Sequence, residues 1–301
     1  MELVTTFAEA RKLAVGRVGL VPTMGYLHEG HLSHVAAGRA QCDTVILSLF
    51  VNPLQFAPDE DLAGYPRDLA RDAILAADAG VDALFAPSST EMYPDEPMTR
   101  VAVAGLGDRL EGRSRQGHFS GVATVVAKLF AGLQPDAAFF GRKDAQQLAV
   151  ITRMAHDLSF PVEVVGGPTV RESDGLALSS RNIYLSQEER SLVPAISRGL
   201  MRAASVAEEG ERSGATLVAI VRAEVEPRLE PEYVELADRE TIETMTRLDR
   251  DAFLSLAVRV GATRLIDNVF FDLSPDGSVV ADRGVVLDGP SLLDSPEPGR
   301  G

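Results

Sequence analysis

Short apolar runs alternate with longer helical stretches along the first half of the chain. The apolar runs are rich in β-branched and aromatic residues, are bounded by Gly, Pro or Asp, and predict buried strands at 18–21, 45–51, 81–85, 137–140 and 162–165. The stretches between them predict helices at 30–41, 68–79, 120–133 and 144–158. Because strands that alternate with helices pair in parallel through right-handed crossovers, residues 1–176 are predicted to form a doubly wound, Rossmann-like α/β domain.

The pattern changes after Gly175. A capping box at 186–189 opens a predicted helix that runs toward Ser205, with a kink expected at Pro194, and a second helix is predicted at 215–229. Strand-like stretches follow at 233–236, 253–260 and 264–271. Residues 177–288 are therefore expected to form a smaller α+β domain that acts as a lid, and the Pro- and Gly-rich segment 289–301 is expected to be disordered.

The charge balance excludes several classes of partner. The 29 Lys and Arg residues against 44 Asp and Glu residues give a formal net charge of −15, which repels nucleic acid and anionic membranes. An anionic substrate must therefore meet a local cluster of positive groups. The single cysteine, Cys42, excludes an intramolecular disulfide and a cysteine-based zinc site. Since the N-terminus also has no cationic start followed by an apolar run, a cytoplasmic location is expected.

Two histidines lie where the first predicted strand gives way to a helix. His28 and His31 are three residues apart, so they lie on one side of the first helical turn. Unpaired N–H groups and the positive end of the helix dipole make such a place suitable for phosphate. Imidazoles there can donate to phosphate oxygens and stabilise the charge that builds on phosphorus. Alternatively, both are ordinary satisfied side chains, or they form a zinc site with His34, although the spacing lacks the two-residue gap of a zincin.

A second polar motif follows the turn at 171–175. Ser179, Ser180 and Arg181 offer two hydroxyls and a guanidinium that can close over a triphosphate. Alone, the motif fits a solvated turn equally well. An early His-x-Gly-His motif combined with a late serine and basic loop is the signature pair of the class I aminoacyl-tRNA synthetase and nucleotidylyltransferase superfamily, whose members direct attack at the α-phosphorus of a nucleoside triphosphate.

Further motifs narrow the family. In chain order they are PTMGYLHEGH at 22–31, FVNPLQF at 50–56, YPR at 65–67, GHFSGV at 117–122, FGRKDAQQ at 140–147 and PTVRE at 168–172. Together with the stretch through Asn182, they closely resemble the pantothenate synthetase family, the ATP-dependent pantoate:β-alanine ligases. The resemblance is ordered from about residue 17 to residue 185 and looser from Tyr233 to Asn268.

The resemblance implies a role for each matching position. It implies that His31 is catalytic with His28 as its companion on the phosphates, and that Lys143 and Arg181 also serve catalysis. It implies an ATP site made of Met24, Gly25, Tyr26, Leu27, His28, Glu29, Gly30, His31, Gly141, Arg142, Lys143, Asp144, Val170, Leu178, Ser179, Ser180 and Arg181. Gln55 and Gln147 would hold pantoate, or β-alanine, through amides that both donate and accept. Asp72 would be a ligand of Mg²⁺ or of its water.

Ordinary alternatives exist for several of these residues. Asp144 could be only a helix N-cap, Lys143 only a solvated charge, and Gln147 only an exposed polar residue. His118 could cap a helix or support the site from outside as readily as touch a ligand. Tyr65 could be a core aromatic residue, and Asp72 a solvated helix acid.

The chain departs from the family pattern at three positions. Arg142 replaces an acidic residue, Ala145 replaces an aromatic residue, and Leu178 stands where methionine is more frequent. None of these changes removes a reacting group, so activity is expected to survive, and the effect falls on nucleotide affinity.

The expected function is condensation of pantoate with β-alanine at the expense of ATP, through a pantoyl adenylate, with release of pyrophosphate and AMP. Mg²⁺ is expected to be held mainly by phosphates and water, and the family resemblance implies a homodimer formed through the first domain. The alternatives are a related nucleotidylyltransferase, a class I synthetase, and a sensor without catalysis. Gln55 and Gln147 argue against the first, the small acidic second domain against the second, and the presence of His31, Lys143 and Arg181 against the third.

Overall fold

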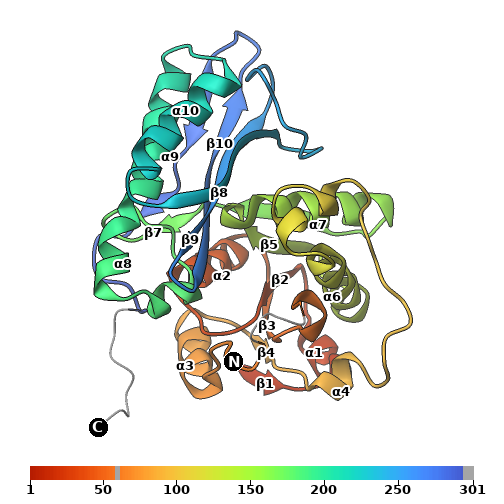
Figure 1. The fold of residues 1–301 in the computed structure, drawn as a ribbon. Coiled ribbons are helices and arrows are strands. Elements are labelled where there is room, and N and C mark those ends of the chain that lie inside the picture. The colour runs from red at the N-terminus through yellow and green to blue at the C-terminus, as the bar shows by residue number, and fades with distance from the viewer. Residues whose placement is uncertain (58–61, 294–301) are drawn as a thin grey trace. The chain divides into compact units, whose positions relative to one another are not determined.

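The computed structural model describes residues 1–57 and 62–293 (Figure 1). These residues form two compact units. The first unit contains Met1–Arg142 and Gln146–Gly167, and the second contains Lys143–Ala145 together with the chain from Pro168 onward. The second unit thus includes three residues from the middle of the predicted phosphate-binding stretch.

The first unit is built on a six-stranded parallel sheet in the order β1-β4-β3-β2-β5-β6. Its strands are β1 (Glu2–Val4), β2 (Val18–Thr23), β3 (Thr44–Leu49), β4 (Ala83–Phe85), β5 (Ala137–Gly141) and β6 (Glu163–Gly167). All five predicted strands are present, and the Rossmann-like α/β class is confirmed. Sequence reasoning missed β1, because three residues of which only Val4 is buried show no strand periodicity.

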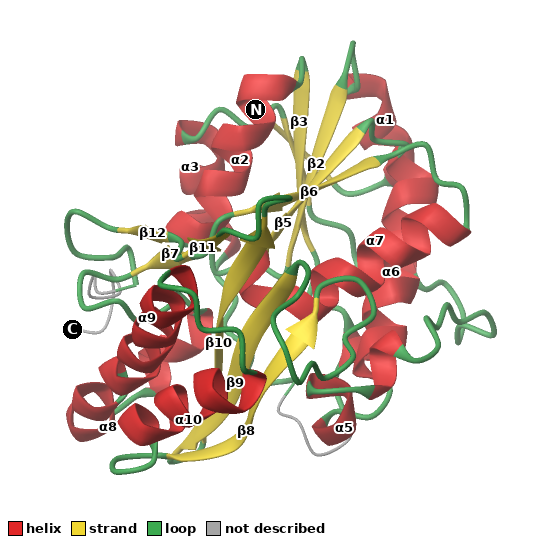
Figure 2. Cartoon of the chain, turned by 90° about the horizontal axis from the view of Figure 1, so that it is seen from above, coloured by secondary structure: helices red, strands yellow, loops and turns green. Residues whose placement is uncertain are grey.

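Helices cover both faces of this sheet. They are α1 (Phe7–Leu13), α2 (Glu29–Gln41), α3 (Leu69–Asp78), α4 (Ser89–Met92), α5 (Glu111–Ser114), α6 (His118–Leu133) and α7 (Ala145–Asp157), with short 3₁₀ turns η1 (Pro53–Gln55), η2 (Leu106–Asp108) and η3 (Arg142–Asp144). Alternate strand residues face opposite sides: Leu20 packs in one core and Val21 in the other. Accordingly, α1, α6 and α7 lie on one side of the sheet, and α2 and α3 on the other (Figure 2).

The second unit contains a four-stranded antiparallel sheet in the order β11-β10-β9-β8. Its strands are β8 (Glu230–Asp238), β9 (Ala252–Val260), β10 (Thr263–Leu273) and β11 (Val279–Asp282). Helices α9 (Pro194–Glu208) and α10 (Gly214–Val225) share one apolar core with this sheet. The short strands β7 (Val170–Arg171) and β12 (Val285–Val286) pair in parallel, and η4 (Ser180–Tyr184) precedes α8 (Gln187–Leu192).

The expected kink at Pro194 is a break between two helices. Helix α8 ends at Leu192, and Pro194 is the first residue of α9. Proline suits a first helical position because its missing N–H would have no intrahelical partner there. The single long helix expected from the sequence is therefore two helices joined at Val193.

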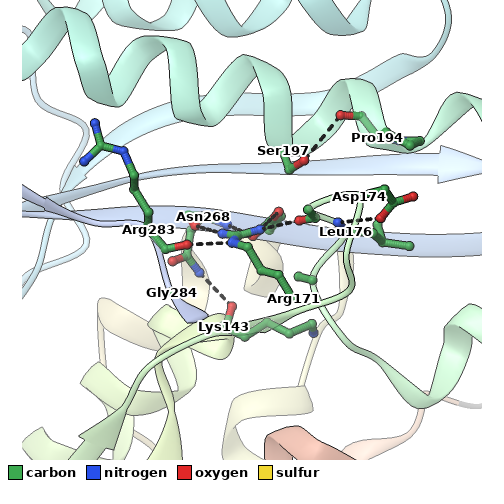
Figure 3. Close-up of polar contacts among 12 residues, drawn as sticks. Lys143, Arg171, Asp174, Leu176, Pro194, Ser197, Asn268, Arg283 and Gly284 are labelled. Carbon is green, nitrogen blue, oxygen red and sulfur yellow. Dashed lines mark hydrogen bonds and ion pairs between the residues drawn. The ribbon is translucent and has the colours of Figure 1, made fainter. Parts of the chain in front are cut away.

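A buried ion pair lies in the second unit. The guanidinium of Arg171 donates to both carboxylate oxygens of Asp267, at 2.6 and 3.0 Å. It also donates to the carbonyl oxygens of Gly175, Asn268 and Arg283 (Figure 3). Both charged side chains are 2% exposed. All five guanidinium N–H groups thus have an acceptor, which is the condition under which a buried arginine is tolerated.

Part of the expected C-terminal tail lies within the described chain. Ser291 is buried, and its hydroxyl accepts the N–H of Leu293 at 3.1 Å. The remainder of the segment expected to be disordered, 294–301, lies outside the described residues. Across the described ranges, no helix combines the length and apolar character needed to cross a membrane.

Arg171→Met should destabilise the second unit by about 3–5 kcal/mol, because it leaves the Asp267 carboxylate buried without its counter-charge. Arg202→Ala is the matched control, since Arg202 is largely exposed and its pair with Glu224 should contribute about 1 kcal/mol or less. Urea unfolding measures both variants. If both variants lost the same small amount of unfolding free energy, the buried pair would not stabilise the unit.

Candidate functional site

The turn between β2 and α2 carries the first predicted motif. Gly25 and Tyr26 both adopt left-handed backbone conformations, with φ of +87° and +52°. Glycine enters this region freely, whereas a tyrosine there costs conformational energy that the surroundings must offset. The turn ends at His28, the N-cap of α2.

Helix α3 holds this turn through two neighbouring side chains. The carboxylate of Asp72 accepts the N–H of Tyr26 and the N–H of Leu27, each at 2.7 Å. Arg71 donates to the carbonyl oxygen of Leu27 at 2.9 Å, and its guanidinium lies 4.9 Å from the centre of the Tyr26 ring. The two residues therefore fix both the main chain and the aromatic ring of the turn.

Asp72 is 2% exposed, so it is not the solvated helix acid that the sequence left open. Burial raises the pKa of its carboxyl, although the N–H groups of Leu27 and Tyr26 act in the opposite direction. Within the described ranges, no group of three or more His, Cys, Asp or Glu side chains is placed to hold a metal ion. The geometry gives Asp72 a role in holding the histidine turn, and its expected role as a Mg²⁺ ligand stays a prediction.

The two histidines cap α2. The Nδ1 atom of His28 accepts the N–H of Gly30 at 3.1 Å, and the Nδ1 atom of His31 accepts the N–H of His28 at 3.3 Å. Their ring centres are 4.1 Å apart. Because each Nδ1 atom accepts, the hydrogen of the neutral ring lies on Nε2. Both imidazoles therefore carry an Nε2–H donor at the positive end of a helix.

Gly30 is required for this arrangement. A Cβ atom at Gly30 would lie 2.8 Å from the Cε1 atom of His28. The glycine in the His-x-Gly-His motif thus makes room for the capping ring. In the described part of the chain, these histidines do not form a group of three or more His, Cys, Asp or Glu side chains placed to hold a metal ion. The zinc alternative therefore has no support there.

Gln55 lies in η1, beyond the carboxyl end of β3. Its Oε1 atom accepts from Asn52 Nδ2 at 3.1 Å, and its Nε2 atom lies 2.9 Å from the sulfur of Met24. The structure thus places Gln55 in contact with Met24, the first residue of the expected ATP site. The side chain is buried, which fits a binding residue held in one conformation.

Asn52 organises this region, and sequence reasoning missed it. Its amide also donates to the carbonyl of Gly121 at 3.1 Å, and its Oδ1 atom accepts from the hydroxyl of Tyr93 at 2.9 Å. Burial raises the pKa of Tyr93 to about 12, so the hydroxyl keeps its proton. The sequence signal that could have identified Asn52 is the pair Asn52-Pro53, an N-cap residue followed by proline at the first position of a helical turn.

His118 supports Gln55 through the main chain. Its Nδ1 atom lies 2.7 Å from the carbonyl oxygen of Gln55, and its Nε2 atom lies 3.0 Å from Arg115 Nη1. Since arginine can only donate, Nε2 accepts and Nδ1 carries the hydrogen. These contacts favour the supporting role over direct contact with a ligand.

The adjacent residues Gln146 and Gln147 of α7 have different surroundings. Gln146 is buried, accepts the N–H of Glu111 at 3.0 Å, and donates to the carbonyls of Leu106 and Arg109 at 2.6 and 2.7 Å. It therefore fixes the segment 106–111. Gln147 is half-buried, as are Gly141 and Arg142 at the end of β5.

The second unit holds the remaining predicted residues. Lys143 Nζ lies 3.8 Å from Asp144 Oδ1, and the Lys143 carbonyl accepts from Asn268 Nδ2 at 2.7 Å. Leu178 N–H donates to the Val170 carbonyl at 2.9 Å, which ties the serine loop to β7. The Ser179 hydroxyl accepts the N–H of Arg181 at 3.3 Å and caps η4, whereas Ser180 is buried.

The comparisons with known proteins agree on one family. The family model described as pantoate-beta-alanine ligase matches residues 1–270. A pantothenate synthetase of Syntrophotalea carbinolica is 55% identical over 254 residues, which cover 84% of this chain and 90% of that protein. The solved pantoate-β-alanine ligase of Thermus thermophilus is 50% identical, with a TM-score of 0.86 over 89% of this chain and 98% of that one. This chain belongs to the pantoate-β-alanine ligase family.

A more distant relative was solved with ligands. The pantoate-β-alanine ligase of Francisella tularensis, in complex with beta-gamma ATP and β-alanine, is 32% identical, with a TM-score of 0.74 over 90% of this chain and 97% of that one. The ligase class and the family predicted from the sequence motifs are confirmed. The reaction of the family is the ATP-dependent condensation of pantoate with β-alanine, as expected. The roles of individual residues stay predictions.

Asp72→Asn should lower the rate of the ligase about tenfold, because an amide oxygen can replace only one of the two acceptors that hold the turn. Asp68→Asn is the matched control: Asp68 caps the same helix, and asparagine caps equally well. Steady-state AMP formation measures both. A normal rate in Asp72→Asn would show that the turn holds without the carboxylate.

The same variant should also change the pH dependence of stability. Burial raises the pKa of Asp72 in the folded protein above its unfolded value, so the folded state binds the proton more tightly. Its contribution to stability is full below the unfolded pKa and is lost as the pH rises through the folded pKa. Relative to Asp72→Asn, the parent should therefore lose stability as the pH increases through that window. Thermal unfolding of the parent and of Asp72→Asn at several pH values measures this. If the melting temperatures of the two proteins changed in parallel with pH, the prediction would be wrong.

Proposed function

We propose that this chain makes pantothenate in two steps through a pantoyl adenylate. In the first step, a carboxylate oxygen of pantoate attacks the α-phosphorus of ATP, and the bond to the pyrophosphate oxygen breaks. In the second step, the β-alanine amine attacks the acyl carbon, the bond between that carbon and the AMP oxygen breaks, and the amine loses a proton. No protein nucleophile is needed, so the chain acts by positioning its substrates and stabilising charge.

The geometry of the histidine turn carries the proposal. His28 and His31 use their Nδ1 atoms to accept main-chain N–H groups, so each carries its ring hydrogen on Nε2 at the start of α2. Negative charge grows on the phosphate oxygens as pyrophosphate leaves. Fixed donors and the helix dipole stabilise that charge without having to reorganise.

Gln55 supports the assignment of a hydroxy-acid substrate. Asn52 fixes the Gln55 amide through its oxygen, which directs the Nε2–H group toward the Met24 sulfur. A thioether is a weak acceptor, so a carboxylate or hydroxyl oxygen of pantoate can replace it with a gain in hydrogen-bond strength. Gln147 would supply a second uncharged amide, as the resemblance implies.

The second unit contributes cations and hydroxyls to the proposed reaction. Lys143 and Arg181 would contact the triphosphate, with Ser179 and Ser180 as further donors and Val170 beside the adenine. Mg²⁺ keeps several water ligands and prefers phosphate oxygens, so it would be held mainly by the phosphates and water. Its presence and the homodimer implied by the family both remain predictions.

Exchange of pyrophosphate into ATP tests the proposed intermediate. Labelled pyrophosphate should enter ATP when pantoate and Mg²⁺ are present and β-alanine is absent, because the first step is reversible on the protein. Gln55→Glu should weaken pantoate binding about tenfold or more, since it keeps the oxygen that Asn52 contacts and replaces the amide donor with a negative charge. Gln41→Ala, on the surface of α2, is the control. Exchange that is independent of pantoate would overturn the substrate assignment.

His31→Ala should reduce adenylation by about 10²–10³-fold while the protein stays folded, which is the scale for losing one donor to a transition-state charge. His156→Ala is the matched control, because that side chain is 82% exposed on α7. Single-turnover formation of the adenylate measures both variants. A near-normal rate in His31→Ala would remove this residue from the mechanism.

A further inference from the structure

The segment Lys143–Ala145 belongs to the second unit, although the residues on both sides of it belong to the first. Asn268, in the middle of β10, contacts this segment: its Nδ2 atom donates to the Lys143 carbonyl oxygen at 2.7 Å. In Figure 3 that carbonyl faces Asn268, and the Lys143 side chain extends to the side, away from Asn268. The hydrogen bond thus fixes the main chain from which the lysine side chain starts.

Asn268 is itself held by the buried ion pair. Its N–H donates to Asp267 Oδ1 at 2.7 Å, and its carbonyl accepts from Arg171 Nη2 at 3.0 Å. The residue is 2% exposed. Since both main-chain polar groups of Asn268 are bound by one ion pair, its side chain starts from a rigid base.

We propose that Asn268 is a positioning residue for Lys143, and that the Arg171–Asp267 pair is the frame that holds it. A lysine side chain has four flexible torsions, so where its ammonium can reach depends on where its main chain is held. Fixing that main chain reduces the disorder of the ammonium before substrate binds. This inference rests on the proposed contact between Lys143 and the triphosphate.

The same frame extends to β7. Arg171 directly follows Val170, the expected adenine contact, and also donates to the carbonyl of Gly175 in the turn that leads to the serine loop. One buried guanidinium therefore fixes the main chain near two parts of the predicted nucleotide site within this unit. Through its side chain, Asn268 connects the Arg171–Asp267 pair to a third part of the predicted nucleotide site, Lys143.

The test compares Asn268→Ala with Val269→Ala. Val269 is the next residue of β10 and is fully buried in the apolar core, so its truncation should also destabilise the unit without changing any contact to Lys143. Asn268→Ala should lower kcat for pantoate-dependent pyrophosphate exchange about 10- to 100-fold, with a much smaller change in the KM for pantoate. Val269→Ala should keep the parent kcat at temperatures where both variants are folded. Equal kcat values in the two variants would overturn the proposal.

Asn268→Asp gives a second variant of the same shape that cannot donate to the Lys143 carbonyl. It should behave like Asn268→Ala, and a parent-like kcat would contradict the assigned hydrogen bond. In a Lys143→Met background, Asn268→Ala should have little additional effect, because its action passes through the lysine side chain. Fully additive effects would show that Asn268 acts elsewhere.

Amide hydrogen exchange separates this inference from the proposed function. In the parent without substrates, the amides of Lys143–Ala145 should exchange more slowly than in Asn268→Ala, whereas Val269→Ala should match the parent. Equal exchange in all three proteins would overturn the inference even if the enzyme makes an adenylate. Slower exchange in the parent without any pantoate-dependent pyrophosphate exchange would contradict the proposed function and leave Asn268 as a structural anchor only.

Discussion

A few buried polar side chains bind main-chain N–H and C=O groups of distant segments, and the residues of the candidate site depend on these contacts. Asp72 accepts two N–H groups of the turn before α2. Asn52, which follows β3, donates to the Gly121 carbonyl in α6, and Arg171 donates to three carbonyls in the second unit. A buried main-chain group without a partner costs free energy comparable to a lost hydrogen bond, so each of these side chains determines a local conformation.

This arrangement suits a reaction in which the protein forms no covalent bond. The substrates supply the nucleophiles and ATP supplies the leaving group, so rate depends on where the donors and cations are held. The residues that would touch substrate are accordingly supported by neighbours: His28 and His31 by Asp72 through the turn, Gln55 by Asn52 and His118, and Lys143 by Asn268. Buried supports of this kind stay in place while ligands come and go.

Much of the first unit could be predicted from the sequence. The strands at 18–21 and 137–140 are apolar on both faces, which is the pattern of a parallel sheet covered by helices, and the order of motifs pointed to the family. The supports could not be predicted in the same way. Asp72 lies about forty-five residues from the turn it holds, Arg171 lies 96 residues from Asp267, and no local periodicity reports such a contact. The sequence motif also does not separate Gln146, which fixes a loop, from its half-buried neighbour Gln147.

The most direct test of the adenylate traces the carboxylate oxygen atoms of pantoate into the products. Pantoate labelled with ¹⁸O in both carboxylate positions is converted with ATP and β-alanine, and the AMP is analysed by mass spectrometry. Attack by the carboxylate on the α-phosphorus, followed by loss of AMP from the acyl carbon, transfers one carboxylate oxygen to phosphorus. The account therefore predicts one ¹⁸O atom in each AMP and none in pyrophosphate. Unlabelled AMP, or label in pyrophosphate or inorganic phosphate, would contradict it.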